Sequence, residues 1–163
     1  MPRVFVSIGS NIDRERNIHV GVDALRKYFG DLTLSRVYES DAVGFVGHRF
    51  YNLVVAFDTV RSLEELMTIV AKIEQRQGRE RRGKKFDNRS LDLDILLYGD
   101  EVRRDDGLNI PRSDILRYAF MLKPLAQIAG DLKHPETGQR LDELWQQFDD
   151  TSQILWEVDL GSL

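Results

Sequence analysis

Two aspartates alternate along a predicted strand directly after a strongly basic segment. The segment from Arg76 to Arg89 contains seven basic residues and two acidic ones, and Asp92 and Asp94 follow it. Guanidinium and ammonium groups neutralise phosphate oxygens, while carboxylates on one face of a strand hold Mg²⁺ against the same phosphates. This combination predicts a binding site for the phosphate groups of a nucleotide.

The alternation predicts how these side chains are oriented. Residues i and i+2 of an extended chain share one face, so Asp92 and Asp94 point the same way. The opposite face, directed toward the core, then carries Leu91, Leu93, Ile95 and Leu97. Two like charges about 7 Å apart repel each other unless a divalent cation or nearby arginines compensate them. A solvated strand face is the alternative explanation of the same pattern.

The composition limits the class of protein. A chain of 163 residues that is 42% hydrophobic forms one core, so we expect residues 1–163 to be a single domain. The formal net charge is -4, although the segment before Asp92 is basic. Local rather than global positive charge disfavours a general nucleic-acid binder and favours a small phosphorylated ligand.

Other residue types exclude further classes of site. The chain has no cysteine, and its histidines, His19, His48 and His134, lack the spacing of a zinc site. The apolar run near the N-terminus is far too short to span a bilayer. We therefore expect a cytoplasmic monomer that binds small molecules and contacts neither membrane nor nucleic acid.

Periodicity predicts the secondary structure. Strands are expected over 4–8, 32–39, 50–58, 91–98 and 154–158, and helices over 14–29, 63–76, 118–129 and 141–148. Ser62 and Glu65 form a capping box that opens the second helix. This order predicts an α+β fold with a ferredoxin-like β-α-β-β-α-β core, a largely antiparallel sheet and helices on both faces. The loops 40–49 and 79–90 are expected to move when ligand binds.

Short segments throughout the chain resemble one enzyme family. They are Ser7–Asn11, Phe50–Asn52, Ile73–Arg79, Arg89–Ile95, Asn109–Pro111 and Phe120–Leu125. In this order and at this spacing they are similar to 6-hydroxymethyl-7,8-dihydropterin pyrophosphokinases. The resemblance implies an enzyme of folate biosynthesis, which transfers diphosphate from ATP to the hydroxymethyl group of a reduced pterin and releases AMP.

The resemblance also implies roles for individual residues at the ATP end. Asp92 and Asp94 match the aspartates that hold two Mg²⁺ ions on the ATP phosphates, and Arg79 and Arg89 match arginines that meet those phosphates. Together these four are the expected catalytic residues. Further contacts with ATP are expected from Arg81, Phe86, Ile95 and Arg112.

At the pterin end, Asn52 matches an asparagine that hydrogen-bonds the ring. Phe50 and Phe120 match two aromatic residues that enclose it, and Val43 lies in the adjoining loop. An amide offers both a donor and an acceptor to a pterin edge, and aromatic faces stack on flat heterocycles. These residues are therefore the expected substrate contacts.

Several positions depart from the family pattern and leave alternatives open. The pair at 87–88 is Asp-Asn where the family has Gly-Pro, Phe86 replaces a tryptophan, Arg112 replaces a histidine and Tyr118 an arginine. One alternative is a divergent paralogue that binds a nucleotide or pterin without this turnover or uses another alcohol. A ferredoxin-like RNA-binding module is disfavoured, because the chain lacks the glycine-aromatic strand pattern and is acidic overall.

Overall fold

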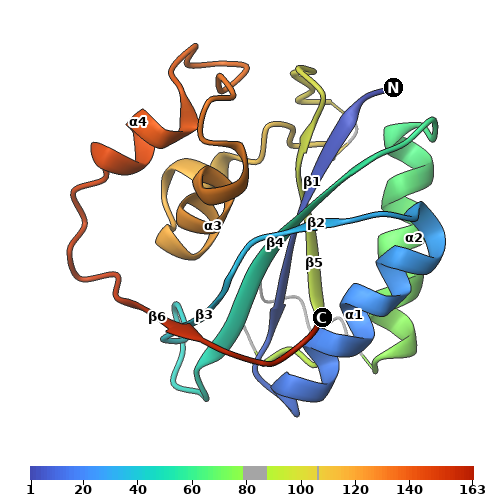
Figure 1. The fold of residues 1–163 in the computed structure, drawn as a ribbon, viewed down its shortest axis with the longest axis vertical. Helices are drawn as coiled ribbons and strands as arrows, with labels where there is room; N and C mark the ends of the chain where they lie inside the picture. The colour runs from blue at the N-terminus through green and yellow to red at the C-terminus, as the bar shows by residue number, and fades with distance from the viewer. Residues whose placement is uncertain (79–87, 106) are drawn as a thin grey trace.

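A computed structural model describes residues 1–78, 88–105 and 107–163 (Figure 1). Its elements in chain order are β1 (Arg3–Ser10), α1 (Arg14–Phe29), β2 (Thr33–Leu34), β3 (Val37–Ser40), β4 (Phe50–Asp58), α2 (Leu63–Arg76), β5 (Asp92–Tyr98), the 3₁₀ helix η1 (Ser113–Leu116), α3 (Ala119–Ala129), α4 (Leu141–Gln146) and β6 (Leu155–Val158). The helices predicted over about 14–29 and 63–76 and the strand predicted over 50–58 are confirmed.

The described residues form one six-stranded sheet with the order β5-β1-β4-β3-β6, and β2 pairs with β4 beside this path. Every one of these strand pairs is antiparallel. The chain passes from β1 through α1 to β3 with β4 between them, and from β4 through α2 to β5 with β1 between them. Two interleaved split β-α-β units result, so the predicted ferredoxin-like core is confirmed.

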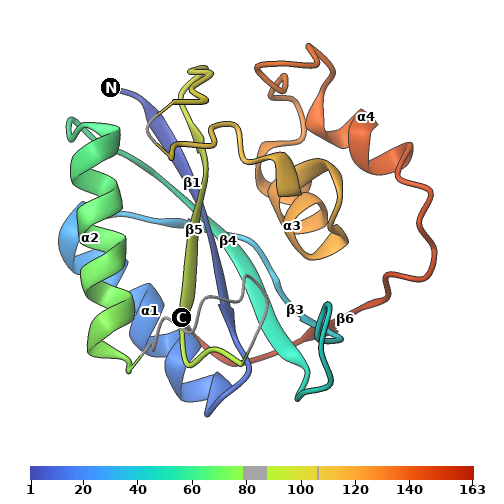
Figure 2. The same ribbon diagram turned by 180° about the vertical axis from the view of Figure 1, so that it is seen from behind.

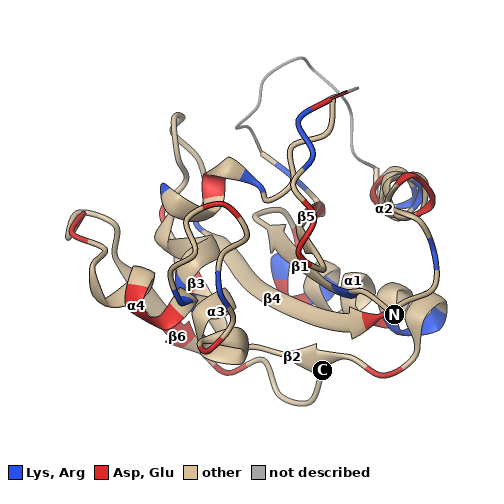
Figure 3. Cartoon of the chain, turned by 90° about the horizontal axis from the view of Figure 1, so that it is seen from above, with Lys and Arg blue, Asp and Glu red and all other residues tan. Residues whose placement is uncertain are grey.

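Helices cover both faces of the sheet (Figures 1 and 2). Viewed from above, α1 and α2 lie on one side and α3 and α4 on the other (Figure 3). Alternate residues of β4 supply both interfaces: Leu53, Val55 and Phe57 pack toward α1 and α2, while Val54 and Ala56 pack toward α3. The central strand is therefore apolar on both faces, as its nearly uninterrupted hydrophobic sequence predicts.

Hydrogen bonds explain two of the element boundaries. The Ser62 hydroxyl accepts from the Glu65 amide at 3.2 Å and the Glu65 carboxylate accepts from the Ser62 amide at 3.2 Å, which confirms the capping box. The predicted strand 32–39 is instead divided into β2 and β3. The Ser35 hydroxyl accepts from the Val54 amide at 2.9 Å in place of a backbone carbonyl, and this interrupts the ladder at that point.

The prediction that Leu97 shares a face with Leu93 and Ile95 is wrong. Val6 pairs with Ile95 but the preceding Phe5 pairs with Leu97, so Leu96 is an extra residue in β5. This bulge reverses the alternation after Ile95. Leu97 consequently packs with Phe5 and α3, whereas Leu93 and Ile95 face α1 and α2.

Helix α3 is joined to the sheet through Tyr38 of β3. The Tyr38 hydroxyl donates to the Gln127 side chain at 3.3 Å, and the Lys123 ammonium lies 5.1 Å from the ring centroid. Burial is the main cause of a raised pKa at Tyr38, with a contribution from Glu157. Its hydroxyl therefore stays protonated and remains a donor at neutral pH.

None of the helices in the described part of the chain has the length and apolar character needed to span a membrane.

His134 predicts a pH-dependent component of stability. Its ring is buried, and Nδ1 accepts from the Glu136 and Thr137 amides at 3.1 and 3.2 Å. Burial, more than any other effect, lowers the pKa of His134 below its usual 6.5. The neutral ring thus contributes stability above pH about 6.5, and this contribution is lost as the pH falls through the lower folded-state pKa.

Urea unfolding of wild-type protein and the His134→Asn variant at pH 7.5 and 5.5 measures this contribution. The asparagine oxygen still accepts hydrogen bonds but does not titrate. We expect the wild type to lose more unfolding free energy between the two pH values than the variant. Equal losses would show that His134 does not carry the effect.

Candidate active site

A cavity of about 160 Å³ opens on the face of the sheet that carries α3. Its walls contain Ser7, Gly9, Ser40, Asp41, Val43, Phe45, Phe50, Asn52, Arg89, Asp92, Asp94, Arg112, Asp114, Phe120 and Met121. All the predicted site residues within the described ranges are among these, with the exception of Ile95. The predicted residues Arg79, Arg81 and Phe86 lie outside the described residues.

The register of three strands places the predicted pterin and phosphate residues side by side. Gly9 of β1 is paired with Asn52 of β4 on one side and with Asp92 of β5 on the other. Ser7 is paired with Asp94 in the same way. Side chains directly opposite one another in antiparallel strands share a face, so the amide and the two carboxylates line the same floor.

Gly9 leaves this part of the cavity floor without a side chain. A Cβ atom at position 9 would lie 3.2 Å from the Asn52 Oδ1 atom and 3.7 Å from the Phe50 ring. A contact of 3.2 Å is tighter than most Cβ contacts, so Asn52 would have to shift slightly, and the added methyl group would project into the cavity. The absence of a side chain at Gly9 therefore joins the Asn52 end of the cavity to the Asp92 end.

The Asn52 end is largely apolar and contains one fixed amide. Asn52 is only 3% exposed, and its Nδ2 donates to the Ser40 hydroxyl at 2.7 Å. Phe50 meets Phe45 edge to face with ring centroids 6.4 Å apart, and Phe120 stacks on Tyr118 at 5.3 Å. These rings border a space suited to a flat heterocycle whose edge is read by an amide.

The other end carries side chains of both charges, two arginines and three aspartates. Arg112 Nη2 lies 3.3 Å from Asp94 Oδ1, and Arg112 Nε lies 3.4 Å from Asp114 Oδ2. Asp114 is 2% exposed and Arg89 is 7% exposed, so both are buried ionisable residues. Buried charges are normally paired, and a cavity wall with arginines and carboxylates together suits an anion that arrives with a cation.

Asn11 is a structural residue of this site that the sequence reasoning did not single out. Its Oδ1 accepts from the Arg89 amide at 2.7 Å, while its Nδ2 donates to Asn88 Oδ1 at 2.8 Å and to the His48 carbonyl at 3.2 Å. One side chain at the end of β1 thus joins two separate loops. Its place at the end of the Ser7–Asn11 motif was the available signal.

Glu74 is a second residue that the sequence reasoning missed. Its side chain is buried on α2, and Oε2 accepts from the Leu93 amide at 2.8 Å. That amide lies between the two aspartates in the chain, so Glu74 fixes the strand that presents them. A carboxylate next to Ile73 and four residues after Val70, on an otherwise apolar stripe, was the sequence signal.

Ile95 lies in a separate groove of about 260 Å³ between α2 and the segment 107–110. The groove is lined mainly by apolar side chains, and it also includes Asp94 and Arg112. The same two residues border the first cavity. The charged end of the cavity therefore continues into an apolar groove beside α2.

The donor set of the site fits a hard divalent cation. Asp92 and Asp94 are partly exposed carboxylates on one face of β5, and both border the cavity. Mg²⁺ is typically bound by one or two protein carboxylates, with phosphate oxygens and water completing its shell. Within the described residues, no group of three or more His, Asp or Glu side chains is placed to hold a metal.

Comparison with known proteins gives a consistent result. A family model described as 7,8-dihydro-6-hydroxymethylpterin-pyrophosphokinase matches residues 5–130. A 2-amino-4-hydroxy-6-hydroxymethyldihydropteridine pyrophosphokinase of Haemophilus influenzae is 34% identical and covers 94% of this chain and 98% of its own. A protein of the same name from Pseudomonas aeruginosa is 37% identical and covers 87% of this chain and 89% of its own.

Solved structures agree at the level of the fold. The wild-type HPPK-DHPS of Plasmodium falciparum matches with a TM-score of 0.70 at 14% identity and covers 90% of this chain. The present chain spans 44% of that longer protein. The resemblance noted in the sequence is confirmed by the family match and by these relatives. The chain belongs to the 7,8-dihydro-6-hydroxymethylpterin pyrophosphokinase family.

Proposed function

We propose that this protein transfers diphosphate from MgATP to the hydroxymethyl group of 6-hydroxymethyl-7,8-dihydropterin and releases AMP. The observation that carries the proposal is the pairing of Gly9 with both Asn52 and Asp92 across the sheet. It places an amide that can hydrogen-bond a heterocycle in the same cavity as the carboxylates of Asp92 and Asp94. A substrate that pairs a flat ring with a reacting alcohol fits this arrangement. The family membership supports the same reaction.

At the pterin end, binding would come from stacking and from hydrogen bonds. Phe50 and Phe120 border the cavity on two elements that are distant in the sequence, and Val43 adds an apolar contact from the loop after β3. The Asn52 amide is held by Ser40, so it would be oriented before the substrate arrives. A fixed amide reduces the entropy that the protein loses on binding.

At the phosphate end, the protein would act by positioning and charge. Arg89 is presented by a backbone that Asn11 holds at both its amide and its carbonyl, with distances of 2.7 and 3.0 Å. Asp92 and Asp94 would hold Mg²⁺, two ions by the family resemblance. When bound, the metal neutralises the triphosphate and orients the β-phosphorus for in-line attack. Arg79 and Arg81 are proposed to contact the same phosphates.

The groove beside α2 is the proposed place for the nucleoside part of ATP. It begins at Asp94 and Arg112, where the phosphates would lie, and its far end is apolar. Ile95 packs on its floor, which gives this residue a contact with the nucleoside rather than with the phosphates. Phe86 is proposed as a further ATP contact.

We also propose that residues 1–163 act as one pterin pyrophosphokinase-like domain and as a cytoplasmic monomer. The continuous sheet supports a single domain, because β6, from the C-terminal end of the sequence, pairs with β3, from the first quarter of the sequence. Analytical ultracentrifugation at micromolar concentration tests whether the protein is a monomer. A dimer at that concentration would contradict it.

Coupled detection of AMP tests the reaction itself. Purified protein with ATP, Mg²⁺ and the hydroxymethyl-dihydropterin is expected to form AMP in proportion to pterin consumed. Binding of ATP or pterin by calorimetry in the same buffer, without AMP above background, would replace this proposal with the non-catalytic paralogue.

Replacement of the aspartates tests the metal role. Asp92→Ala or Asp94→Ala should lower turnover by about 10³-fold or more, because metal stabilisation of transition-state charge is worth several kcal/mol. The fold should persist, since both side chains are partly exposed and carry like charge. Asp58→Ala, which removes an exposed carboxylate paired with Arg3 at 3.3 Å, is the matched control. Unchanged turnover in either site variant would remove the metal role.

Gly9→Ala tests the placement of the ring. The added methyl group would lie 3.2 Å from Asn52 Oδ1 in the floor of the cavity. We expect the KM for the pterin to rise about tenfold, since one misplaced methyl group in a pocket costs about 1–3 kcal/mol. The KM for ATP, measured on the same preparation, is the internal control. An equal rise in both constants would show general distortion rather than a blocked pterin site.

A further inference from the structure

A network of four charged residues has three members on the face of the sheet opposite the cavity, Arg14, Glu39 and Arg49, while the fourth, Asp41, borders the cavity. Glu39 of β3 is paired in register with Tyr51 of β4 and with Trp156 of β6. The three side chains therefore form one row across the sheet. Their neighbours in sequence, Ser40 and Asn52, point to the other face and border the cavity.

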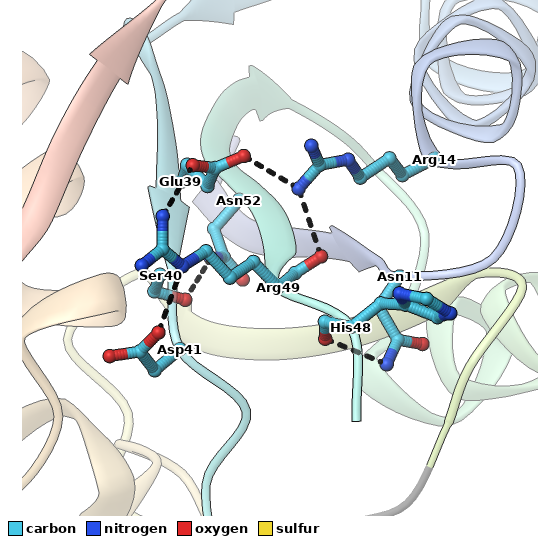
Figure 4. A network of polar contacts seen from close by, with 8 residues as sticks. All are labelled: Asn11, Arg14, Glu39, Ser40, Asp41, His48, Arg49 and Asn52. Atoms are coloured by element: carbon cyan, nitrogen blue, oxygen red, sulfur yellow. Dashed lines mark hydrogen bonds and ion pairs between the residues drawn. The ribbon is translucent and has the colours of Figure 1, made fainter. Parts of the chain in front are cut away.

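Two arginines meet the carboxylate of Glu39. Arg14 Nη1 lies 2.7 Å from Oε2, and Arg49 Nη1 lies 3.4 Å from Oε1 (Figure 4). Each guanidinium also lies over a ring of the row: Arg14 is 3.8 Å from the Tyr51 centroid and Arg49 is 4.2 Å from the Trp156 centroid. The Glu39 side chain is only 17% exposed, so it is largely enclosed by these partners.

The same arginines hold the ends of the segment 41–49. Arg49 Nε donates to Asp41 Oδ1 at 3.0 Å, which links the first and last residues of the segment (Figure 4). This hydrogen bond is the main cause of a raised pKa at Arg49. Arg14 Nη1 donates to the Arg49 carbonyl at 3.0 Å and connects the segment to α1.

Between these ends the segment is also held by the hydrogen bond from Asn11 to the His48 carbonyl and by the edge-to-face contact of Phe45 with Phe50. Its sequence contains no proline and includes Gly44, which adopts φ 79°, and Gly47. Val46 is fully exposed, while Val43 and Phe45 border the cavity. A glycine-containing loop loses much conformational entropy when it is ordered, so fixing its ends lowers the cost of placing these two side chains.

We propose that Arg14, Glu39, Asp41 and Arg49, here called the Glu39 network, position the loop 41–49 for pterin binding, with all but Asp41 lying on the far face of the sheet. The proposal rests on the proposed function, because it assigns the loop to the pterin. These four are positioning residues, since none is proposed to contact the reacting atoms. Their removal should weaken pterin binding and leave the chemical step unchanged.

The test uses Arg49→Met, which keeps an unbranched apolar stem and removes the contacts of the guanidinium with Glu39, Asp41 and the Trp156 ring. Arg36→Met is the matched control. Arg36, which precedes β3, forms an exposed ion pair with Glu157 of β6 at 2.8 Å, and neither residue borders the cavity. Asp41→Asn, at an exposed position, is a second network variant that preserves size and removes the charge. The measurements are steady-state KM and kcat, and backbone amide order parameters by ¹⁵N relaxation without ligand.

We expect the pterin KM of Arg49→Met to rise about three- to tenfold, since each exposed ion pair or cation–π contact contributes a factor of about two to five. We expect kcat to stay within about twofold, and Asp41→Asn to show a smaller shift in the same direction. Order parameters at 42–48 should fall below about 0.6 in Arg49→Met and stay higher in wild type and Arg36→Met.

Order parameters that are equal in wild type and Arg49→Met would overturn the proposal, as would a pterin KM equal to that of Arg36→Met. A wild-type protein without turnover would instead contradict the proposed function. The relaxation measurement would still decide whether the Glu39 network orders the loop, because it requires no substrate. The two failures are therefore distinguishable.

Discussion

The antiparallel register of β1 between β4 and β5 is the constraint on which the site depends. It places Gly9 opposite both Asn52 and Asp92, and Ser7 opposite Asp94. A shift of one residue in either pairing would turn the amide or the carboxylates to the other face of the sheet. The buried residues of β4 oppose such a shift. Leu53, Val55 and Phe57 pack against α1 and α2, and Val54 and Ala56 pack against α3, so a shift would break both sets of apolar contacts.

The two faces of the sheet have different roles, one forming the cavity and the other supporting the strands around it. On the α3 face, the residues near the ends of β1, β4 and β5 form the cavity. On the other face, Glu74 holds the backbone between the aspartates, and Glu39 holds the strand beside Ser40 and the loop that follows. Both carboxylates are buried or nearly so, and both act on residues whose neighbours face the cavity. Rigid support from the far face lets the cavity keep exposed polar groups at fixed positions.

Sequence periodicity predicted much of this arrangement and failed for identifiable reasons. The alternation of Asp92 and Asp94 and the capping box at Ser62 depend on local geometry, and both were correctly predicted. Leu97 was placed on the wrong face because a bulge depends on the partner strand and leaves no mark in the sequence of β5. The division at Ser35 has the same origin, since its hydroxyl replaces a carbonyl in a bond to another strand.

The polar residues that support the site show a second limit of reasoning from local sequence. Asn11, Glu39 and Glu74 act through partners that are distant in the chain, so their roles become visible only when the fold is known. The residues proposed to contact ligand were easier to predict, because their types and spacing are constrained by the expected ligand itself. The resemblance to the family predicted these positions and missed those that hold them in place.

Charge balance at the end of the cavity links the fold to the proposed chemistry. Arg112 lies between Asp94 and Asp114, and its guanidinium compensates two carboxylates at 3.3 and 3.4 Å. In the proposed function, MgATP would bring both a cation and excess negative charge, so a metal on Asp94 would reduce the attraction that holds Arg112 there while the phosphates would offer it a new partner. Asp114 is buried beside Arg112, and this second ion pair would limit how far the arginine could move. Arg112 would therefore exchange a carboxylate for a phosphate oxygen without leaving its site.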